Sequence, residues 1–362
     1  MRQLRRMRPA SAYIDQSQFD REMAAHFLSG WVGVGRSEDL PETGSFVQRS
    51  IAGEKLLLVR GPDQIRAFHN VCRHRGTQLC SQGRGHFVGS IQCSYHAWTW
   101  GLDGRLRAAP HFSEDDGFRL EDFPLHSPEC AQWGGHLFVN LSKNPAPLED
   151  GLGSVMKKFA PWPMENLRIG HTICYDVAAN WKLIIQNYSE CLHCPTVHPA
   201  LARLSHYMTG DNEPATQFYL GGTMKLNDGV KTMTMSGESN RAIFSSLGEY
   251  DRRHIYYYAL IPNMLLSLHP DYVVSYTLWP KAPNRTEIVC DFQFDPVEMR
   301  CPGFSAMDAV EFWDLTNRQD WRVSELSQLG MNSLSYMPGP YSIREGLLAA
   351  FDEIMIKALD GV

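Results

Sequence analysis

The sequence has 362 residues, of which 43% are hydrophobic and 20% are charged, and its net charge at pH 7 is −6. This length exceeds the usual size of one domain, so we expect two folded cores. A mildly acidic chain lacks the clustered Lys and Arg that bind phosphate, which argues against a nucleic acid partner. The basic start, MRQLRRMRPA, is not followed by an apolar run of signal-peptide length, and no stretch approaches the roughly 18 apolar residues of a membrane span. We therefore expect a cytoplasmic protein that does not enter the membrane.

The first part of the chain predicts a helical segment followed by a small β domain. Residues 1–43 are expected to be mainly helical and to pack on the second domain. From residue 44 to 143, short apolar runs alternate with glycine-rich turns, which is typical of an all-β domain. The pair Asp103-Gly104 predicts a hairpin turn, because both residues tolerate positive φ. A linker rich in proline and polar residues is expected at 144–150.

The second part, residues 150–362, is expected to be an antiparallel sheet covered by helices. Helices are predicted at 180–194, 308–329 and 342–359. Runs rich in β-branched and aromatic residues predict four strands, at 255–261, 264–269, 272–279 and 285–294. The fold class is therefore expected to be α+β.

The nine cysteines are expected to be free thiols. Reducing compartments keep thiols reduced, and an odd number with irregular spacing is poor evidence for a disulfide framework. Cys191 and Cys194 flank His193, and we expect them to be packing residues, because no fourth ligand for a zinc ion is evident.

Two cysteines and two histidines form two tight pairs on loops, Cys72-Arg-His74 and Cys93-Ser-Tyr-His96. A zinc ion and a two-iron cluster compete for this spacing. Zinc sites usually pair Cys with Cys and His with His, whereas here each loop supplies one of each. Mixed loops suit a [2Fe–2S] cluster in which one iron takes both thiolates and the other takes both imidazoles. The pattern Cys-x-His-Arg-Gly with Cys-x-x-His-x-Trp resembles the Rieske motif, which implies that residues 44–143 are a Rieske [2Fe–2S] domain.

A second set of metal-capable residues lies between positions 187 and 198. Glu190 and His193 are three residues apart and would share one helical face. His193 and His198 would diverge by about 140° on an unbroken helix, but Pro195 interrupts the helix and lets His198 fold back. Two histidines and one carboxylate form the facial triad of non-haem Fe(II) oxygenases, which leaves positions open for O₂ and substrate.

This second set resembles the Rieske oxygenase motif Asn-x-x-Asp/Glu-x-x-His-x-x-x-x-His, which here begins at Asn187. In that family the third iron ligand is an aspartate on a C-terminal helix. The run Asn317-Arg-Gln-Asp320-Trp matches the family pattern and implies Asp320 as the ligand. Asp314, on the same predicted helix, is the alternative.

The chain is thus similar to the α subunits of Rieske non-haem iron oxygenases over nearly its whole length. The resemblance implies a catalytic domain of the helix-grip type, one Rieske cluster and one mononuclear Fe(II) per chain, and O₂ as co-substrate. It also implies electrons from a ferredoxin or flavin reductase, and a homotrimer in which the cluster of one subunit sits beside the iron of its neighbour. Glu190 occupies the position whose carboxylate bridges these two sites. A Rieske electron carrier without oxygenase activity would not need the second motif.

Glutamate at position 190 is similar to the family branch that acts on quaternary ammonium compounds, such as the glycine betaine, carnitine and choline monooxygenases. Aromatic dioxygenases usually carry aspartate there. Residues 180–182, 262–272 and 338–345 resemble the same branch. The small-molecule substrate is therefore expected to be a quaternary ammonium compound that is hydroxylated or oxidatively demethylated; an aromatic ring-hydroxylating dioxygenase or an O-demethylase is the alternative. Aromatic faces hold such a cation at ~0.5–2 kcal/mol each. The candidate pocket residues are Tyr207, Phe218, Tyr219, Tyr256, Tyr258, His269 and Trp313.

Overall fold

The computed structural model describes residues 4–359, which form two compact units. The small unit is Phe27–Ala146, and the large unit combines the described residues up to His26 with those from Pro147 onward. The first boundary lies earlier than position 43, because strand β1 (Val32–Arg36) pairs with β10 (His136–Asn140) and so belongs to the small unit.

The small unit is built from three antiparallel sheets, as expected for an all-β domain. The first has the order β1-β10-β9, the second β4-β3-β2-β5 and the third β6-β7-β8. The remaining strands are β2 (Ser45–Ile51), β3 (Glu54–Arg60), β4 (Ile65–His69), β5 (Arg84–His86), β6 (Ser90–Gln92), β7 (Thr99–Gly101), β8 (Leu106–Ala108) and β9 (Glu129–Trp133). Their buried side chains form one hydrophobic core, which includes Phe46, Leu57, Phe68, Trp98 and Trp100.

The predicted hairpin turn connects β7 and β8. Gly104 has a φ of +80°, whereas Asp103 is not in the left-handed region, so only one residue of the pair needs the freedom expected of both. A Cβ atom at position 104 would lie 2.5 Å from the ring of Phe68. Glycine is therefore required here for close packing as well as for the turn.

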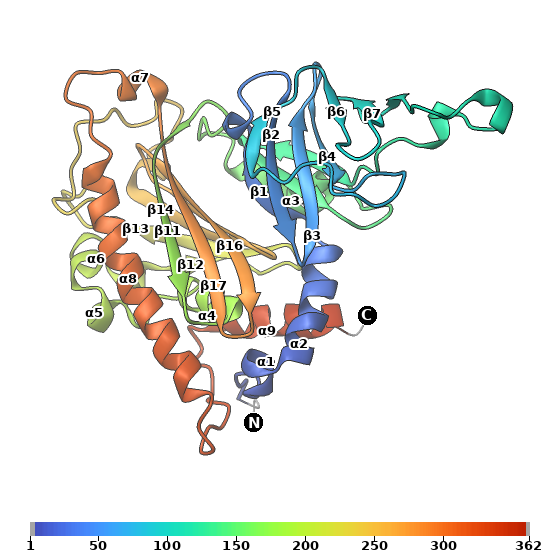
Figure 1. The fold of residues 1–362 in the computed structure, drawn as a ribbon. Helices are drawn as coiled ribbons and strands as arrows, with labels where there is room; N and C mark the ends of the chain where they lie inside the picture. The colour runs from blue at the N-terminus through green and yellow to red at the C-terminus, as the bar shows by residue number, and fades with distance from the viewer. Residues whose placement is uncertain (1–3, 360–362) are drawn as a thin grey trace. The chain divides into compact units, whose positions relative to one another are not determined.

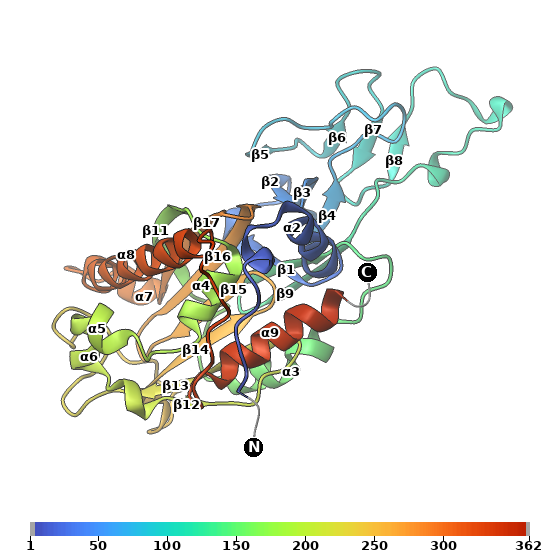
Figure 2. The same ribbon diagram turned by 90° about the horizontal axis from the view of Figure 1, so that it is seen from below.

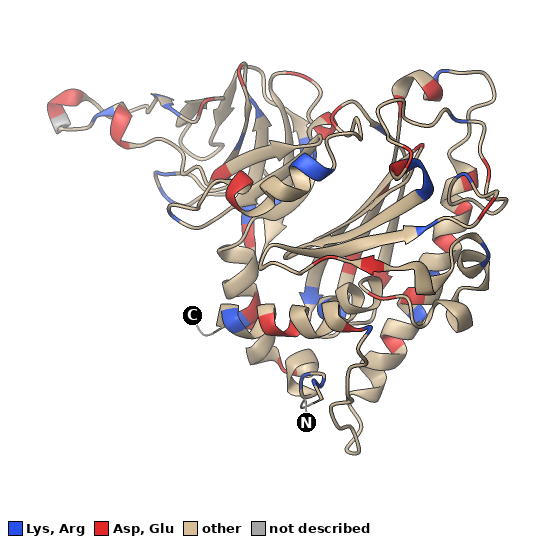
Figure 3. Cartoon of the chain, turned by 180° about the vertical axis from the view of Figure 1, so that it is seen from behind, with Lys and Arg blue, Asp and Glu red and all other residues tan. Residues whose placement is uncertain are grey.

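The large unit contains a seven-stranded antiparallel sheet with the order β11-β17-β16-β15-β14-β13-β12 (Figure 1). The strands are β11 (Arg168–Val177), β12 (Asp211–Asn212), β13 (Tyr219–Lys225), β14 (His254–Leu260), β15 (Met264–Leu268), β16 (Val273–Ala282) and β17 (Arg285–Phe294). The last four agree closely with the four predicted strands, and the α+β prediction is confirmed. Charged residues lie mainly on helices and loops, and the strands are mostly uncharged (Figure 3).

Helices cover both faces of this sheet. The tyrosines of β14 show that α4 (Trp181–Tyr188) and α8 (Met307–Gly330) lie on one face and α3 (Leu148–Lys158) on the other. Tyr257 turns toward Tyr188 of α4 and Trp313 of α8, with ring centroids 6.1 and 6.2 Å away. Tyr258 points to the other face and contacts Phe159, which directly follows α3, at 4.9 Å. Because α3 begins at Leu148, the predicted linker is partly helical. In the part of the chain that is described, no helix is long and apolar enough to cross a membrane.

The N-terminal segment is tied to the large unit through buried charges. Helix α2 (Gln16–Glu22) lies beside α9 (Gly346–Leu359) (Figures 1 and 2). Glu22 is completely buried and pairs with both Lys182 at the start of α4 and Arg8, the latter at 3.2 Å. Burial lowers the pKa of Lys182 to about 8, even though Glu22 opposes that shift. The opposite charge and the hydrogen bond of Glu22 therefore offset part of the cost of burying the Lys182 ammonium.

Replacing Lys182 with methionine is expected to destabilise the large unit by about 3 kcal/mol, because Glu22 loses a buried partner. The thermal midpoint, followed by tryptophan fluorescence, should fall by on the order of 10 °C. Arg285→Ala is the matched control: its ion pair with Asp176 is well exposed, so its loss should leave the thermal midpoint nearly unchanged. Equal shifts in the two variants would contradict a special role for the buried pair.

Candidate metal centres and active-site pocket

The two Cys/His loops of the small unit share one backbone design. In each loop the cysteine carbonyl accepts a 3.1 Å hydrogen bond from the residue four positions later, Gly76 or Ala97. In each, the cysteine N–H donates to the carbonyl five positions later at 2.8 Å. Gly76 and Ala97 both adopt positive φ, +71° and +56°. The two loops therefore share one turn geometry, although His74 follows its cysteine by two residues and His96 follows its cysteine by three.

The four side chains fit a two-iron cluster. Cys72 and Cys93 are buried in the hydrophobic core, and His74 stacks on Trp98 with ring centroids 5.0 Å apart. The imidazoles of His74 and His96 have centroids 4.7 Å apart, and their Nδ1 atoms are buried without a hydrogen-bond partner among the described residues. Buried ring nitrogens without partners are expected where a metal takes the lone pair.

These four donors do not form a single-ion site. Within residues 4–359, the donor atoms that lie within 4.8 Å of one another, close enough for one ion, belong to the large unit instead. A wider spacing suits a cluster whose two irons each take two ligands, and it disfavours the zinc alternative.

The iron-ligand segment of the large unit is built from short helices rather than one interrupted helix. Helix α4 begins at the N-cap Asn180, whose side chain accepts from the Lys182 N–H, and ends at Tyr188. Helices α5 (Cys194–Val197) and α6 (Pro199–Leu204) follow, each with proline in its first turn. Pro195 therefore starts a helix, which corrects the prediction that it interrupts one.

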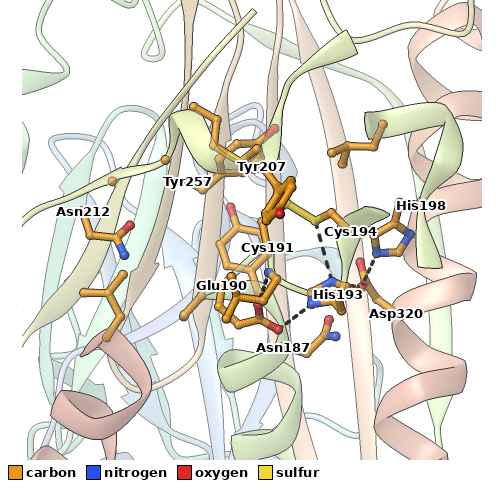
Figure 4. Close-up of a pocket in the computed structure, with 18 of the residues that line it drawn as sticks. Asn187, Glu190, Cys191, His193, Cys194, His198, Tyr207, Asn212, Tyr257 and Asp320 are labelled. Atoms are coloured by element: carbon orange, nitrogen blue, oxygen red, sulfur yellow. Dashed lines mark hydrogen bonds and ion pairs between the residues drawn. A yellow bond between two sulfur atoms is a disulfide. The ribbon is translucent and has the colours of Figure 1, made fainter. Parts of the chain in front are cut away.

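Asp320 on α8 lies between the two predicted histidine ligands (Figure 4). Its Oδ1 is 2.8 Å from His198 Nε2 and 3.3 Å from His193 Nε2. His198 sits between α5 and α6, so a single helical turn separates it from His193. Two imidazoles and one carboxylate thus converge on one point, as the facial triad requires.

Each imidazole is oriented through its other nitrogen. His193 Nδ1 contacts Glu190 Oε1 at 2.5 Å, and His198 Nδ1 contacts Gln319 Oε1 at 2.8 Å. An Nδ1–H that donates to these oxygens leaves the Nε2 lone pair free to bind a metal. Glu190 therefore contacts His193 as expected, although both lie outside any helix and the predicted shared helical face is wrong. Gln319 was not predicted, and only its position next to Asp320 could have indicated it.

The electrostatics of the site favour a cation. Burial lowers the pKa of His193, but hydrogen bonds to Asp320 and Glu190 outweigh burial and raise that pKa to about 10. Burial raises the pKa of Asp320, but hydrogen bonds from the two histidines hold it below its ordinary value. The negative charge of Asp320 beside two imidazoles forms a donor set suited to Fe(II).

Asp314, the alternative third ligand, lies elsewhere. Its Oδ1 accepts a 2.9 Å hydrogen bond from the Tyr175 hydroxyl, and its Oδ2 pairs with Arg318 at 2.9 Å. Both oxygens are therefore engaged away from the histidines.

Cys191 and Cys194 form a disulfide, which corrects the expectation that all cysteines are free; the seven others are free thiols. The Cys194 N–H donates to the Cys191 carbonyl at 3.2 Å, and this turn brings the two side chains together. Cys194 Sγ is 3.9 Å from His193 Nε2, but its bond to Cys191 leaves it no thiolate to offer a metal. The carboxylate of Asp320 is then the available third donor.

A partly open pocket with a volume of about 120 Å³ adjoins the triad. Asn187, Glu190, His193, His198 and Asp320 line it, and the buried Asn187 Oδ1 has no partner among the described residues. The other lining side chains include Tyr188, Tyr207, Asn212, Thr223, Tyr257, Trp313 and Arg344.

The predicted substrate pocket needs correction at several positions. Tyr207 and Trp313 line it, but Phe218, Tyr219, Tyr256, Tyr258 and His269 do not. Tyr256 and Tyr258 contact Phe159 on the opposite face of the sheet. Phe218 packs against Gly151 of α3. The hydroxyl of Tyr219 shares a 2.8 Å hydrogen bond with the hydroxyl of Ser154 on the same helix.

His269 is completely buried and stacks on Tyr272 at 4.1 Å, behind Trp313. Tyr257, rather than the predicted Tyr256 and Tyr258, lines the pocket from β14, because alternate side chains of a strand point to opposite faces. The alternation was visible in the sequence, but which face holds the pocket was not.

Comparison with known proteins gives two family matches. The model described as "Ring hydroxylating alpha subunit (catalytic domain)" matches residues 164–361, and the model described as "Rieske [2Fe-2S] domain" matches residues 30–124. The predicted cluster ligands lie within the second match, and the predicted iron ligands lie within the first. The chain therefore has a Rieske [2Fe–2S] cluster and a mononuclear iron as its cofactors, with O₂ as co-substrate.

Similar proteins include the glycine betaine monooxygenase oxygenase subunit of Pseudomonas aeruginosa, 30% identical over 92% of this chain and 84% of that protein. The carnitine monooxygenase oxygenase subunit of Escherichia coli strain K12 is 37% identical over 54% of this chain and 52% of its own length. Among solved structures, the quaternary ammonium Rieske monooxygenase CntA with L-carnitine aligns with a TM-score of 0.78 at 23% identity, covering 98% of this chain and 95% of that one. Naphthalene 1,2-dioxygenase from Rhodococcus aligns with 0.77 at 17%, covering 97% and 94%. These two structural matches show the fold alone.

Asp320→Asn is expected to release the mononuclear iron, because the amide supplies no negative charge to the two histidines. Iron content should fall from about three to about two per chain, while the visible absorption of the cluster remains. Asp314→Asn, which changes a carboxylate six residues earlier on the same helix, should keep all the iron. Iron loss in the second variant but not the first would reverse the assignment.

Proposed function

This chain belongs to the family of ring-hydroxylating oxygenase α subunits, and on that premise we propose that it is the oxygenase component of a monooxygenase acting on a quaternary ammonium compound. Oxygen insertion at an N-methyl C–H bond would give a carbinolamine that collapses to a demethylated amine and formaldehyde. Insertion at another carbon would give a stable alcohol.

The observation that supports this substrate class is the aromatic wall beside the triad. Tyr207, Tyr257 and Trp313 line the same pocket as the three iron donors. Trp313 Nε1 donates to Tyr272 at 2.8 Å, which fixes the indole in place. Aromatic faces attract a cation that cannot donate hydrogen bonds, at ~0.5–2 kcal/mol each, and indole is the best of them.

The roles of the metal-site residues follow from their contacts. His193, His198 and Asp320 would hold the iron, which when bound supplies open positions for O₂ while the cluster supplies electrons one at a time. Glu190 and Gln319 would keep the imidazoles in the metal-binding tautomer. The disulfide between Cys191 and Cys194 would restrain the loop that carries His193.

Electrons come from a separate reductase, and we propose a ferredoxin or a flavoprotein as this partner. We also propose a homotrimer in which Glu190 connects the iron of one subunit to the cluster of the next. The support is that Glu190 lines the pocket edge and contacts an iron-ligand histidine through its carboxylate.

An aromatic dioxygenase is the second candidate, because the same aromatic wall could also hold a neutral ring. The two candidates differ in the charge of the substrate, since a neutral ring gains nothing from cation–π attraction.

With a surrogate reductase, glycine betaine or carnitine is expected to stimulate NADH oxidation and release formaldehyde or a hydroxylated product, whereas naphthalene should give neither. Trp313→Leu should raise the KM for the ammonium substrate by roughly 5- to 30-fold, because an apolar side chain of smaller area lacks the quadrupole. Product formation from naphthalene but from no ammonium compound would favour the dioxygenase.

Glu190→Gln is expected to keep both metal centres but slow the reoxidation of the reduced cluster by roughly 10- to 100-fold, because the bridging negative charge is lost. Stopped-flow absorption of the cluster after mixing with O₂ and substrate measures this rate. Gln319→Leu removes the equivalent contact at His198 Nδ1. It therefore serves as the control for any slowing that comes only from loss of the orientation of an iron-ligand histidine. Equal slowing in the two variants would mean that Glu190 only orients His193.

A further inference from the structure

Arg344 is the one Lys or Arg side chain among the described residues that line the pocket, and it lies just before α9. Its guanidinium forms no hydrogen bond or ion pair with any other residue in the range 4–359. Neither the family resemblance nor the metal chemistry assigns it a role. An unpaired guanidinium at the edge of a binding pocket is available to an anion.

The charges of the pocket are separated. Its acidic residues, Glu190 and Asp320, are both at the metal end, where each contacts His193. Helix α9, which begins two residues after Arg344, contacts β13 and so lies beside the strand pair β12–β13. Asn212 of β12 marks this side, and Figure 4 shows it across the pocket from His198 and Asp320. The pocket is therefore acidic at one end and basic at the other.

Between these ends the pocket is aromatic and nearly neutral. Tyr207, Tyr257 and Trp313 line it, and the hydroxyl of Tyr257 is buried without a partner among the described residues. Burial raises the pKa of Tyr257 well above its ordinary value, so this hydroxyl stays protonated and can donate.

We propose that the substrate is a zwitterion whose carboxylate is bound by Arg344 and whose quaternary ammonium lies over the aromatic residues, toward the metal end. This inference rests on the proposed function and selects, within it, amino-acid betaines over simple ammonium alcohols. The reverse orientation would place the carboxylate beside Glu190 and Asp320, where like charges repel it. Arginine suits this task because its planar fork binds both carboxylate oxygens, which the point charge of lysine cannot do.

A matched pair of ligands isolates the carboxylate. Glycine betaine and its carboxamide have the same trimethylammonium group and nearly the same shape, and only the first has a negative charge. Binding of each to the metal-loaded protein is measured by calorimetry without O₂, so the readout does not depend on turnover. Choline, which has a hydroxyl in place of the carboxylate, is the third ligand.

The variants are Arg344→Gln, Arg344→Lys and, as the control, Arg300→Gln, an exposed arginine outside the pocket. The wild-type protein should bind glycine betaine about tenfold more tightly than the carboxamide or choline. Arg344→Gln should remove this difference by weakening glycine betaine alone, Arg344→Lys should keep part of it, and Arg300→Gln should keep all of it.

Three results would overturn the inference, and they can be distinguished from one another. If the wild-type protein binds all three ligands equally and Arg344→Gln changes nothing, Arg344 is no carboxylate site, while the proposed function stands. If the wild-type protein binds none of the three, the proposed function fails and this inference fails with it. Equal weakening of the carboxamide by Arg344→Gln would also contradict a role specific to the carboxylate.

Discussion

The carboxylate of Asp320 between two imidazoles is the contact on which the catalytic unit depends. This contact joins Asp320 to His198, which are 122 positions apart in the chain. It also places the negative charge of Asp320 in a buried position, where a cation or a proton must compensate it. The short helices α5 and α6 bring His193 and His198 together, but α8 must lie alongside them to complete the set. Any change that moves α8 relative to this segment therefore changes the metal site.

The sheet fixes the position of α8 through the same helix face that forms the pocket. Asn317 accepts from Tyr276 of β16 at 3.2 Å, and Trp313 donates to Tyr272 beside that strand at 2.8 Å. Trp313, Asn317 and Asp320 follow helical spacing, so one face of α8 anchors the helix, supplies part of the aromatic wall and carries the proposed iron ligand. The substrate pocket and the iron site are thus positioned by one rigid element.

Much of the site could be predicted because its information is local. The two Cys/His loops and the segment that begins at Asn187 depend on spacing within short stretches, as do the four central strands. The face of the sheet that holds the pocket could not be predicted in this way. The side chains of residues 256–258 alternate between the two faces in any strand. Only the packing of α3, α4 and α8 shows that Tyr257 is the one on the pocket side. The disulfide could not be predicted from the number and spacing of the cysteines. It depends on the turn that brings Cys191 and Cys194 together, which the sequence pattern does not show.

The two metal centres consequently differ in how their ligand sets arise. The proposed cluster ligands all lie within residues 72–96, on two loops that close their own hydrogen bonds. The proposed iron ligands need contacts of long range, which cost more loop-closure entropy than local ones. Iron that binds only the assembled site stabilises the packing of α8 by mass action. The chain therefore couples retention of its mononuclear iron to the integrity of its sheet, whereas the cluster depends mainly on the small unit that contains it.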